Sequence, residues 1–149
     1  MCQKSVATLN TIAKDGAKSH KLSIAGVGGT EGCGIQVIAD AEIVSADQLS
    51  ALQGHNAIKL RLDKFQCITQ LIALANAARK LRLAVVFGVS EDEAEVGDTF
   101  ITDLAVGLGV GQLSGGGLES GEFISIFNRQ AEIQLETESI SFVRKHFRT

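Results

Sequence analysis

Short apolar runs alternate with longer segments of helical periodicity along the chain, and this alternation limits the possible folds more than any other feature. Each run is nearly continuous in aliphatic residues, a pattern typical of parallel strands that helices cover on both faces. The sequence therefore predicts an α/β protein with a parallel sheet. The expected strands are KLSIAGV (21–27), IQVIADAEI (35–43), AIKLRLD (57–63), LAVVFGVS (83–90) and a brief strand near 111–113.

The helical segments are marked by apolar residues three and four positions apart. In the clearest of them we expect Phe65, Ile68, Ile72 and Ala75 to form the buried face. The expected helices are 3–15, 46–53 with Ser45 as its cap, 64–81, 98–110 with Asp98 as its cap, and 119–138.

Only the glycine-rich loop GGTEGCG (28–34) separates the first two expected strands. A parallel pair is usually joined by a crossover of about a dozen residues or more, so this connection is predicted to be shortened. No linker or low-complexity tract divides the chain, and we expect a single domain over residues 1–149.

Composition and charge exclude several classes of partner. Apolar residues make up 45% of the chain, the net charge is -3 and the pI is near 5.6. These values give no electrostatic reason to expect nucleic acid or an anionic membrane as a partner. The N-terminus lacks the apolar stretch of a signal peptide, and Cys2, Cys33 and Cys67 have no metal-ligand spacing. An intracellular, cytoplasmic protein with free thiols is predicted, with Cys67 in the core.

The C-terminal half carries a motif of high specificity. DTFITDLAVGL is followed by a GQ dipeptide, a glycine-rich turn and FNRQAEIQLE, and this order holds over about 40 residues in one register. The stretch resembles the C-terminal barrel segment of enolases, which has the form DTFIADLVVGL, GQIKTGAP and YNQLLRIEEEL. Upstream, IQVIADAEI is similar to the family's IQIVADDLTVT, and IKLRLDKFQCITQLIAL is similar to LLLKVNQIGSVTESLQA.

This resemblance is weak over residues 1–34 and clearer over 35–138, with a basic tail at 139–149. It implies the last five strands of the eight-stranded β/α barrel of the enolase superfamily. Within that superfamily, DLAVGLGV followed by GGLxxGE is most similar to a divergent enolase-like branch associated with sperm flagella.

Enolases dehydrate 2-phosphoglycerate with a lysine base and Mg²⁺ ions. The resemblance aligns the family's metal-binding glutamate with Ala25, which cannot bind a metal ion. It aligns a metal-binding aspartate with Asp40, the one functional position that is retained. The catalytic lysine corresponds to Arg61, which stays protonated and cannot accept a proton. An alternative for Asp40 is a structural role, with its carboxylate bonded to loop amides.

The substrate-binding positions differ in the same way. The family's histidine, arginine and serine of SHRS align with Val89, Ser90 and Glu91, and the lysine of GQIK aligns with Ser114. These replacements remove phosphate contacts and add a negative charge. Taken together, the substitutions predict a catalytically degenerate chain with no cofactor, unless Asp40 still contributes to a Mg²⁺ site.

Two hypotheses follow. The first is a pseudoenzyme that serves as a structural or assembly subunit of a larger complex, with a ciliary or axonemal location implied by the flagellar branch. The alternative is an enzyme subunit that contributes to Mg²⁺-dependent phosphopyruvate hydratase activity in glycolysis. In that case a partner supplies the residues that this chain lacks, or the chain uses a replaced mechanism.

Five strands cannot close a barrel, because the eighth strand has to pair with the first. Open edges are expected at 21–27 and near 111–113. We therefore predict a protein partner that completes or covers the sheet: another enolase-like chain, a second copy of this one, or an unrelated scaffold. The basic tail, 139–149, is either solvated or binds an acidic surface such as a microtubule.

Overall fold

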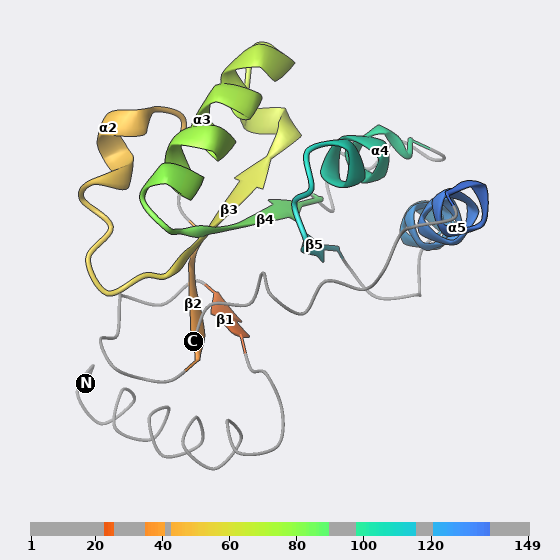
Figure 1. The fold of residues 1–149 in the computed structure, drawn as a ribbon, viewed down its shortest axis with the longest axis horizontal. Coiled ribbons are helices and arrows are strands. Elements are labelled where there is room, and N and C mark those ends of the chain that lie inside the picture. Colours follow the sequence, from red (N-terminus) through yellow and green to blue (C-terminus); the bar gives the residue numbers. More distant parts are fainter. Residues whose placement is uncertain (1–22, 26–34, 41–42, 90–97, 116–120, 138–149) are drawn as a thin grey trace.

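A computed structural model describes residues 23–25, 35–40, 43–89, 98–115 and 121–137. These residues form one five-stranded sheet in which every neighbouring pair is parallel and the strand order follows the sequence, β1-β2-β3-β4-β5 (Figure 1). Sequential parallel strands with helices between them are the arrangement of a β/α barrel. The predicted fold class, a partial β/α barrel, is therefore confirmed.

All five predicted strands are present, and the helices are shorter than predicted. The elements are β1 (Ser23–Ala25), β2 (Gln36–Ala39), α2 (Ala46–Leu49), β3 (Ala57–Arg61), the 3-10 turn η1 (Leu62–Lys64), α3 (Ile68–Lys80), β4 (Ala84–Gly88), α4 (Phe100–Gly107), β5 (Leu113–Ser114) and α5 (Gly121–Glu136). The helix predicted at 3–15 and the basic tail at 139–149 lie outside the described residues. No helix within the described ranges is both long and apolar enough to cross a bilayer.

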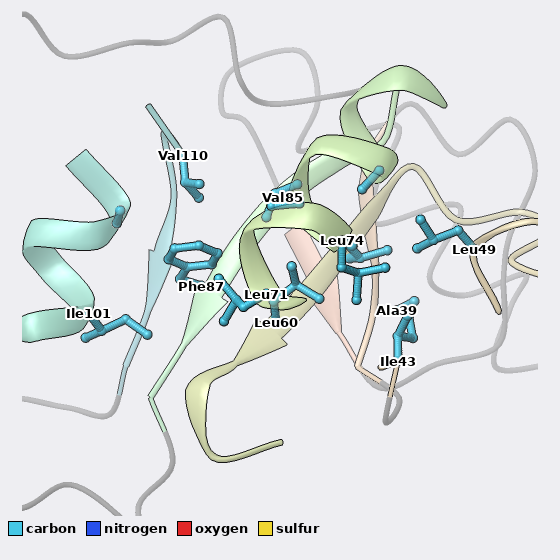
Figure 2. Packing of buried hydrophobic residues seen from close by; sticks show 14 of the residues in the cluster. Ala39, Ile43, Leu49, Leu60, Leu71, Leu74, Val85, Phe87, Ile101 and Val110 are labelled. Atoms are coloured by element: carbon cyan, nitrogen blue, oxygen red, sulfur yellow. The ribbon is translucent and has the colours of Figure 1, made fainter. Parts of the chain in front are cut away.

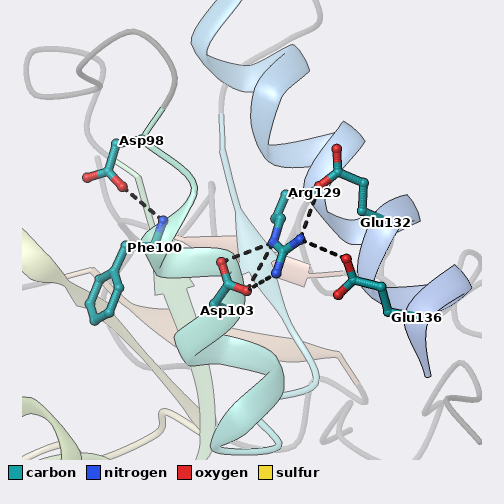
Figure 3. Close-up of polar contacts among 6 residues, drawn as sticks. All are labelled: Asp98, Phe100, Asp103, Arg129, Glu132 and Glu136. Atoms are coloured by element: carbon teal, nitrogen blue, oxygen red, sulfur yellow. Dashed lines mark hydrogen bonds and ion pairs between the residues drawn. The ribbon is translucent and has the colours of Figure 1, made fainter.

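Ser45 is the N-cap residue of α2, as predicted, whereas the N-cap residue of α4 is Thr99 and the predicted cap, Asp98, lies one residue before it. Gln48 Oε1 accepts the backbone N–H of Ser45 at 3.0 Å at the start of α2. Asp98 Oδ1 accepts the N–H of Phe100 at 2.9 Å at the start of α4 (Figure 3). Both bonds satisfy N–H groups that have no partner inside the helix.

One connection is unusual. β1 and β2 pair in parallel, with Ser23 opposite Gln36 and Ala25 opposite Ile38. The sequence-based expectation of a short join between two parallel strands is therefore confirmed. The path of residues 26–34 lies outside the described residues.

The main core lies between the sheet and its helices (Figure 2). On α3 the buried residues are Leu71, Leu74, Ala75 and Ala78, which share one face at helical spacing. Of the predicted face, Ala75 is buried and Phe65 packs against the core, whereas Ile72 is only partly buried and Ile68 is exposed. From the sheet, alternate strand residues point into the same core: Ala39, Ile58, Leu60, Val85 and Phe87.

Cys67 is exposed, so its predicted place in the core was wrong. The reason is the position at which the helix begins. Cys67 is the extended N-cap residue of α3, with φ -150°, and η1 ends three residues before it. A residue outside the first helical turn does not share the helical periodicity from which its burial was inferred.

The opposite face of the sheet carries a smaller apolar cluster formed by Ile38, Ala57, Ala84 and Val86. This face corresponds to the interior of a barrel. Beside the cluster, Gln36 is fully buried and exchanges two side-chain hydrogen bonds with Gln112, of 2.8 and 3.1 Å. A buried amide pair of this kind satisfies polar groups that would otherwise be costly to desolvate.

Candidate functional site

The carboxyl ends of the strands lie at one edge of the sheet. Arg61 at the end of β3 is opposite Gly88 at the end of β4, and Gly88 is opposite Ser114 of β5. Ala25 ends β1, and Asp40 follows β2 directly. Since ligands of open and closed α/β sheets bind at this edge, it is the candidate site.

Most positions predicted from the resemblance can be located at this edge. The backbone N–H of Val89 donates to the carbonyl oxygen of Ser114 at 2.9 Å, which continues the β4–β5 pairing. Ser90 and Glu91, predicted to replace phosphate contacts, lie outside the described residues. The Cα register brings Ala25, Arg61 and Ser114 to the same edge as Asp40.

Asp40 is paired with a residue that the sequence analysis did not single out. Lys59 Nζ lies 3.3 Å from Asp40 Oδ2, and both side chains are partly accessible at this edge. The side-chain exposures are 19% for Lys59 and 32% for Asp40. Neither a metal ion nor a loop amide, the two expected partners of Asp40, is therefore needed to neutralise its carboxylate.

The expectation of a uniformly apolar strand at 57–63 gives no indication of Lys59 as a site residue. In the sequence AIKLRL, Ile58 and Leu60 are buried against the helices, whereas Lys59 and Arg61 are half-buried on the other face. Successive strand residues point to opposite sides, so two basic residues two positions apart belong to one face. That period of two was the signal in the sequence that could have identified the pair.

Arg61 is held at the site by a neighbouring carboxylate. Its Nε and Nη2 donate to the two oxygens of Asp63 at 3.0 and 2.9 Å. Asp63 belongs to η1, the turn that follows β3, and Lys64 Nζ lies 3.4 Å from the same carboxylate. A two-bond pair of this type fixes the plane of the guanidinium group.

A magnesium site requires several oxygen ligands in octahedral geometry. Within the described ranges, no three His, Cys, Asp or Glu side chains lie close enough together to hold one metal ion. The carboxylate of Asp40 faces the Lys59 ammonium, which repels a divalent cation. The described residues therefore do not by themselves fit a magnesium ion.

Away from the strand ends, one ion-pair network joins the last two helices. Arg129 of α5 donates to both oxygens of Asp103 in α4, with a shortest distance of 2.8 Å, and to Glu132 and Glu136 on its own helix (Figure 3). The hydrogen bonds from Arg129 hold the pKa of Asp103 below its ordinary value of 3.8. The same bonds, first those to Asp103, raise the pKa of Arg129. This network positions α5 beside α4 and is not part of the strand-end site.

Comparison with known families agrees with this geometry. The model of the enolase C-terminal TIM barrel domain matches residues 13–147. The match extends into the N-terminal region, where the sequence resemblance was weak, and it includes every described strand.

Individual relatives are bacterial enzymes. The chain is 29% identical over 106 residues to the enolase of Mycoplasmoides gallisepticum, a match that covers 68% of this chain and 22% of the relative. It is 35% identical over 81 residues to the enolase of Ureaplasma parvum, covering 54% and 18%. It is 32% identical over 103 residues to enolase 2 of Lactobacillus johnsonii, covering 66% and 24%. The aligned part of this chain therefore spans about a fifth to a quarter of the relatives' length.

The prediction of a chain without catalysis is contradicted by these matches, because the relatives carry the name of an enzyme. That prediction rested on the substituted site positions alone. The flagellar branch and an axonemal location remain untested predictions. By the family match over residues 13–147 and the five-stranded parallel sheet, this chain belongs to the enolase C-terminal TIM barrel family.

Proposed function

We propose that the chain is the C-terminal barrel part of an enolase-type lyase and contributes to the dehydration of 2-phosphoglycerate to phosphoenolpyruvate. The observation that carries this proposal is the family match over residues 13–147, with sequential parallel strands whose ends present charged side chains at one edge. The relatives that share this part of the fold are named enolase.

The chain's own residues have a limited set of roles in this reaction. Arg61, fixed by Asp63, cannot accept a proton but can orient an anionic substrate through its charge. Lys59 and Asp40 place one positive and one negative charge at the strand ends. The proton-accepting group and the remaining substrate contacts are therefore assigned to the rest of the barrel. That part lies either on the same polypeptide or on a partner chain.

The outer surface supports completion by further polypeptide. α5 buries Phe123, Ile126 and Ile133, but it also leaves Ile124, Phe127 and Leu135 exposed, and Leu135 is 86% accessible. At 100° per residue, the three exposed positions form one stripe next to the buried face. In a barrel the helices form a closed ring, so the last helix has a neighbour on both sides. Within the described residues α5 packs against α4, and we assign the stripe to the helix that follows it in the ring.

The proposal is tested on the protein as cells assemble it. A tagged chain is purified with whatever co-purifies, and the mass of the assembly is measured by light scattering. The same sample is assayed for phosphoenolpyruvate formation from 2-phosphoglycerate. We expect an assembly heavier than the 15.7 kDa chain that forms phosphoenolpyruvate. An inactive, well-folded assembly would count against the proposal, and so would a monomer with no activity.

A further inference from the structure

Lys59 reaches Asp40 because its stem lies over a glycine. Lys59 is opposite Val86 in the β3–β4 register, while Gly88 is opposite Arg61. A Cβ atom placed on Gly88 would nevertheless lie 2.4 Å from Lys59 Cε and 3.0 Å from Lys59 Cγ. The lysine stem therefore extends from residue 59 to the level of Arg61, toward the carboxyl ends of the strands. Gly88 is the residue that leaves room for it.

The stem is also confined on its other side. The same Cβ on Gly88 would lie 3.2 Å from Arg61 Cγ, so the Lys59 and Arg61 stems lie side by side over Gly88. Arg61 is held in turn by Asp63. The direction of the Lys59 side chain is thus set by packing along its length as well as by attraction to Asp40.

We propose that the Lys59 ammonium occupies the place beside Asp40 that a divalent metal ion would take, so that this carboxylate is neutralised from within the chain. The ammonium lies 3.3 Å from Asp40 Oδ2, close enough to repel a second cation strongly in a partly desolvated site. The pair is half-exposed and contributes little to stability. The pair instead determines whether a divalent cation can bind beside Asp40.

The consequence concerns the complete barrel and rests on the proposed function. Any divalent ion used by the whole enzyme is held by ligands from outside the described strands, because Asp40 already has its cation. This differs from the expectation in which Asp40 retains a metal-binding role.

The test measures Mn²⁺ binding by the isolated chain through the loss of the free Mn²⁺ signal in electron paramagnetic resonance. The variants are Asp40→Asn, Lys59→Met and the double variant, with Lys80→Met as control. Methionine keeps an unbranched stem over Gly88 and removes only the charge. Lys80 is an exposed residue at the end of α3, where the chain returns to the start of β4. Its replacement changes the net charge equally.

We expect the wild-type chain, Lys80→Met and Asp40→Asn to bind Mn²⁺ equally weakly. Lys59→Met should bind at least about tenfold more tightly, and the double variant should lose that gain. The proposal would be overturned if the wild-type chain bound Mn²⁺ and Asp40→Asn abolished that binding. It would also be overturned if Lys59→Met bound Mn²⁺ no more tightly than the wild-type chain. If Lys59→Met does not fold, Lys59→Gln takes its place. The comparison of the wild-type chain with Asp40→Asn requires no substitution of Lys59. Mn²⁺ binding is measured without substrate, so a failure of this test does not count against the proposed lyase activity. Conversely, an assembly that forms no phosphoenolpyruvate does not change the Mn²⁺-binding result.

Discussion

Gln36 and Gln112 bind each other's side-chain amides, although their strand regions are not neighbours in the sheet. Gln36 begins β2 and Gln112 directly precedes β5, with β3 and β4 between them. In a flat sheet three strand spacings would separate these strands by about 14 Å. Their amides lie within 3.1 Å of each other, so the sheet is curved toward its inner face, as a barrel segment has to be.

This pair gives the first prediction. Gln36→Leu leaves the partner amide of Gln112 without the bonds it now exchanges and should lower the free energy of unfolding by about 1–3 kcal/mol. The double variant Gln36→Leu/Gln112→Leu should recover part of that loss, because an apolar pair leaves no amide unsatisfied. Urea unfolding of the four chains of the double-mutant cycle measures the coupling. A single variant as stable as wild type would show that the pair does not hold the curvature.

Gly88 should tolerate no side chain while Lys59 keeps its present path. Gly88→Ala places a methyl group 2.4 Å from Lys59 Cε and 3.0 Å from its Cγ, so the flexible lysine stem has to move, and we expect a loss of stability of about 1 kcal/mol. Lys59→Ala removes the obstacle, so the Gly88→Ala change should cost less in that background. The comparison needs only thermal or urea unfolding. Equal costs in both backgrounds would mean that the lysine stem does not lie over Gly88.

The link between α4 and α5 should depend on pH in one direction. Bonding to Arg129 lowers the pKa of Asp103 below 3.8, so the folded state binds its proton less readily than the unfolded state. The stabilisation is therefore complete above the unfolded pKa and is lost as the pH falls through the lowered folded pKa. Asp103→Asn should remove this acid-side dependence and lower the melting temperature at neutral pH by a few degrees at most. Asp47→Asn, at an exposed position on α2, is the matched control. If the difference in melting temperature between Asp103→Asn and Asp47→Asn stayed the same from neutral pH to pH 3, the assignment of this pH dependence to Asp103 would be contradicted.

The apolar stripe on α5 predicts where the rest of the barrel binds. Leu135→Glu should weaken the native assembly without unfolding the chain, because the side chain is 86% exposed and contributes little to the chain's own core. Val44→Glu changes another exposed apolar residue, 48% accessible, just before α2. Size-exclusion chromatography with light scattering should show a smaller mass for Leu135→Glu alone. An equal loss of assembly mass in both variants, or no loss in either, would rule out the stripe as the contact.

Local patterns in the sequence were sufficient for the strands and for the N-cap of α2, because these depend on residues close together in the chain. The cap of α4 was placed one residue early, and the strand order followed from the resemblance. Ile68 was wrongly expected on the buried face of α3, because the helix begins at Ile68, after η1, and a count from Phe65 does not follow the helical period. The Gln36–Gln112 pair joins residues 76 positions apart and depends on sheet curvature, which no local pattern encodes. At the site, Asp40 was found from the resemblance. Its partner Lys59 was not, since the path of a long side chain over Gly88 is decided by packing between two strands.

The central claim is that this curved, open sheet becomes an enolase-type lyase when the barrel is completed. The most direct measurement is the rate of phosphoenolpyruvate formation from 2-phosphoglycerate by the native assembly, compared between wild type, Asp40→Asn and the Asp47→Asn control. We predict a measurable rate for wild type and the control, and at least about a tenfold loss for Asp40→Asn, since it leaves the Lys59 ammonium without its counter-charge at the reacting edge of the strands. A wild-type assembly of full barrel mass that forms no phosphoenolpyruvate, or an Asp40→Asn assembly as active as wild type, would contradict the account.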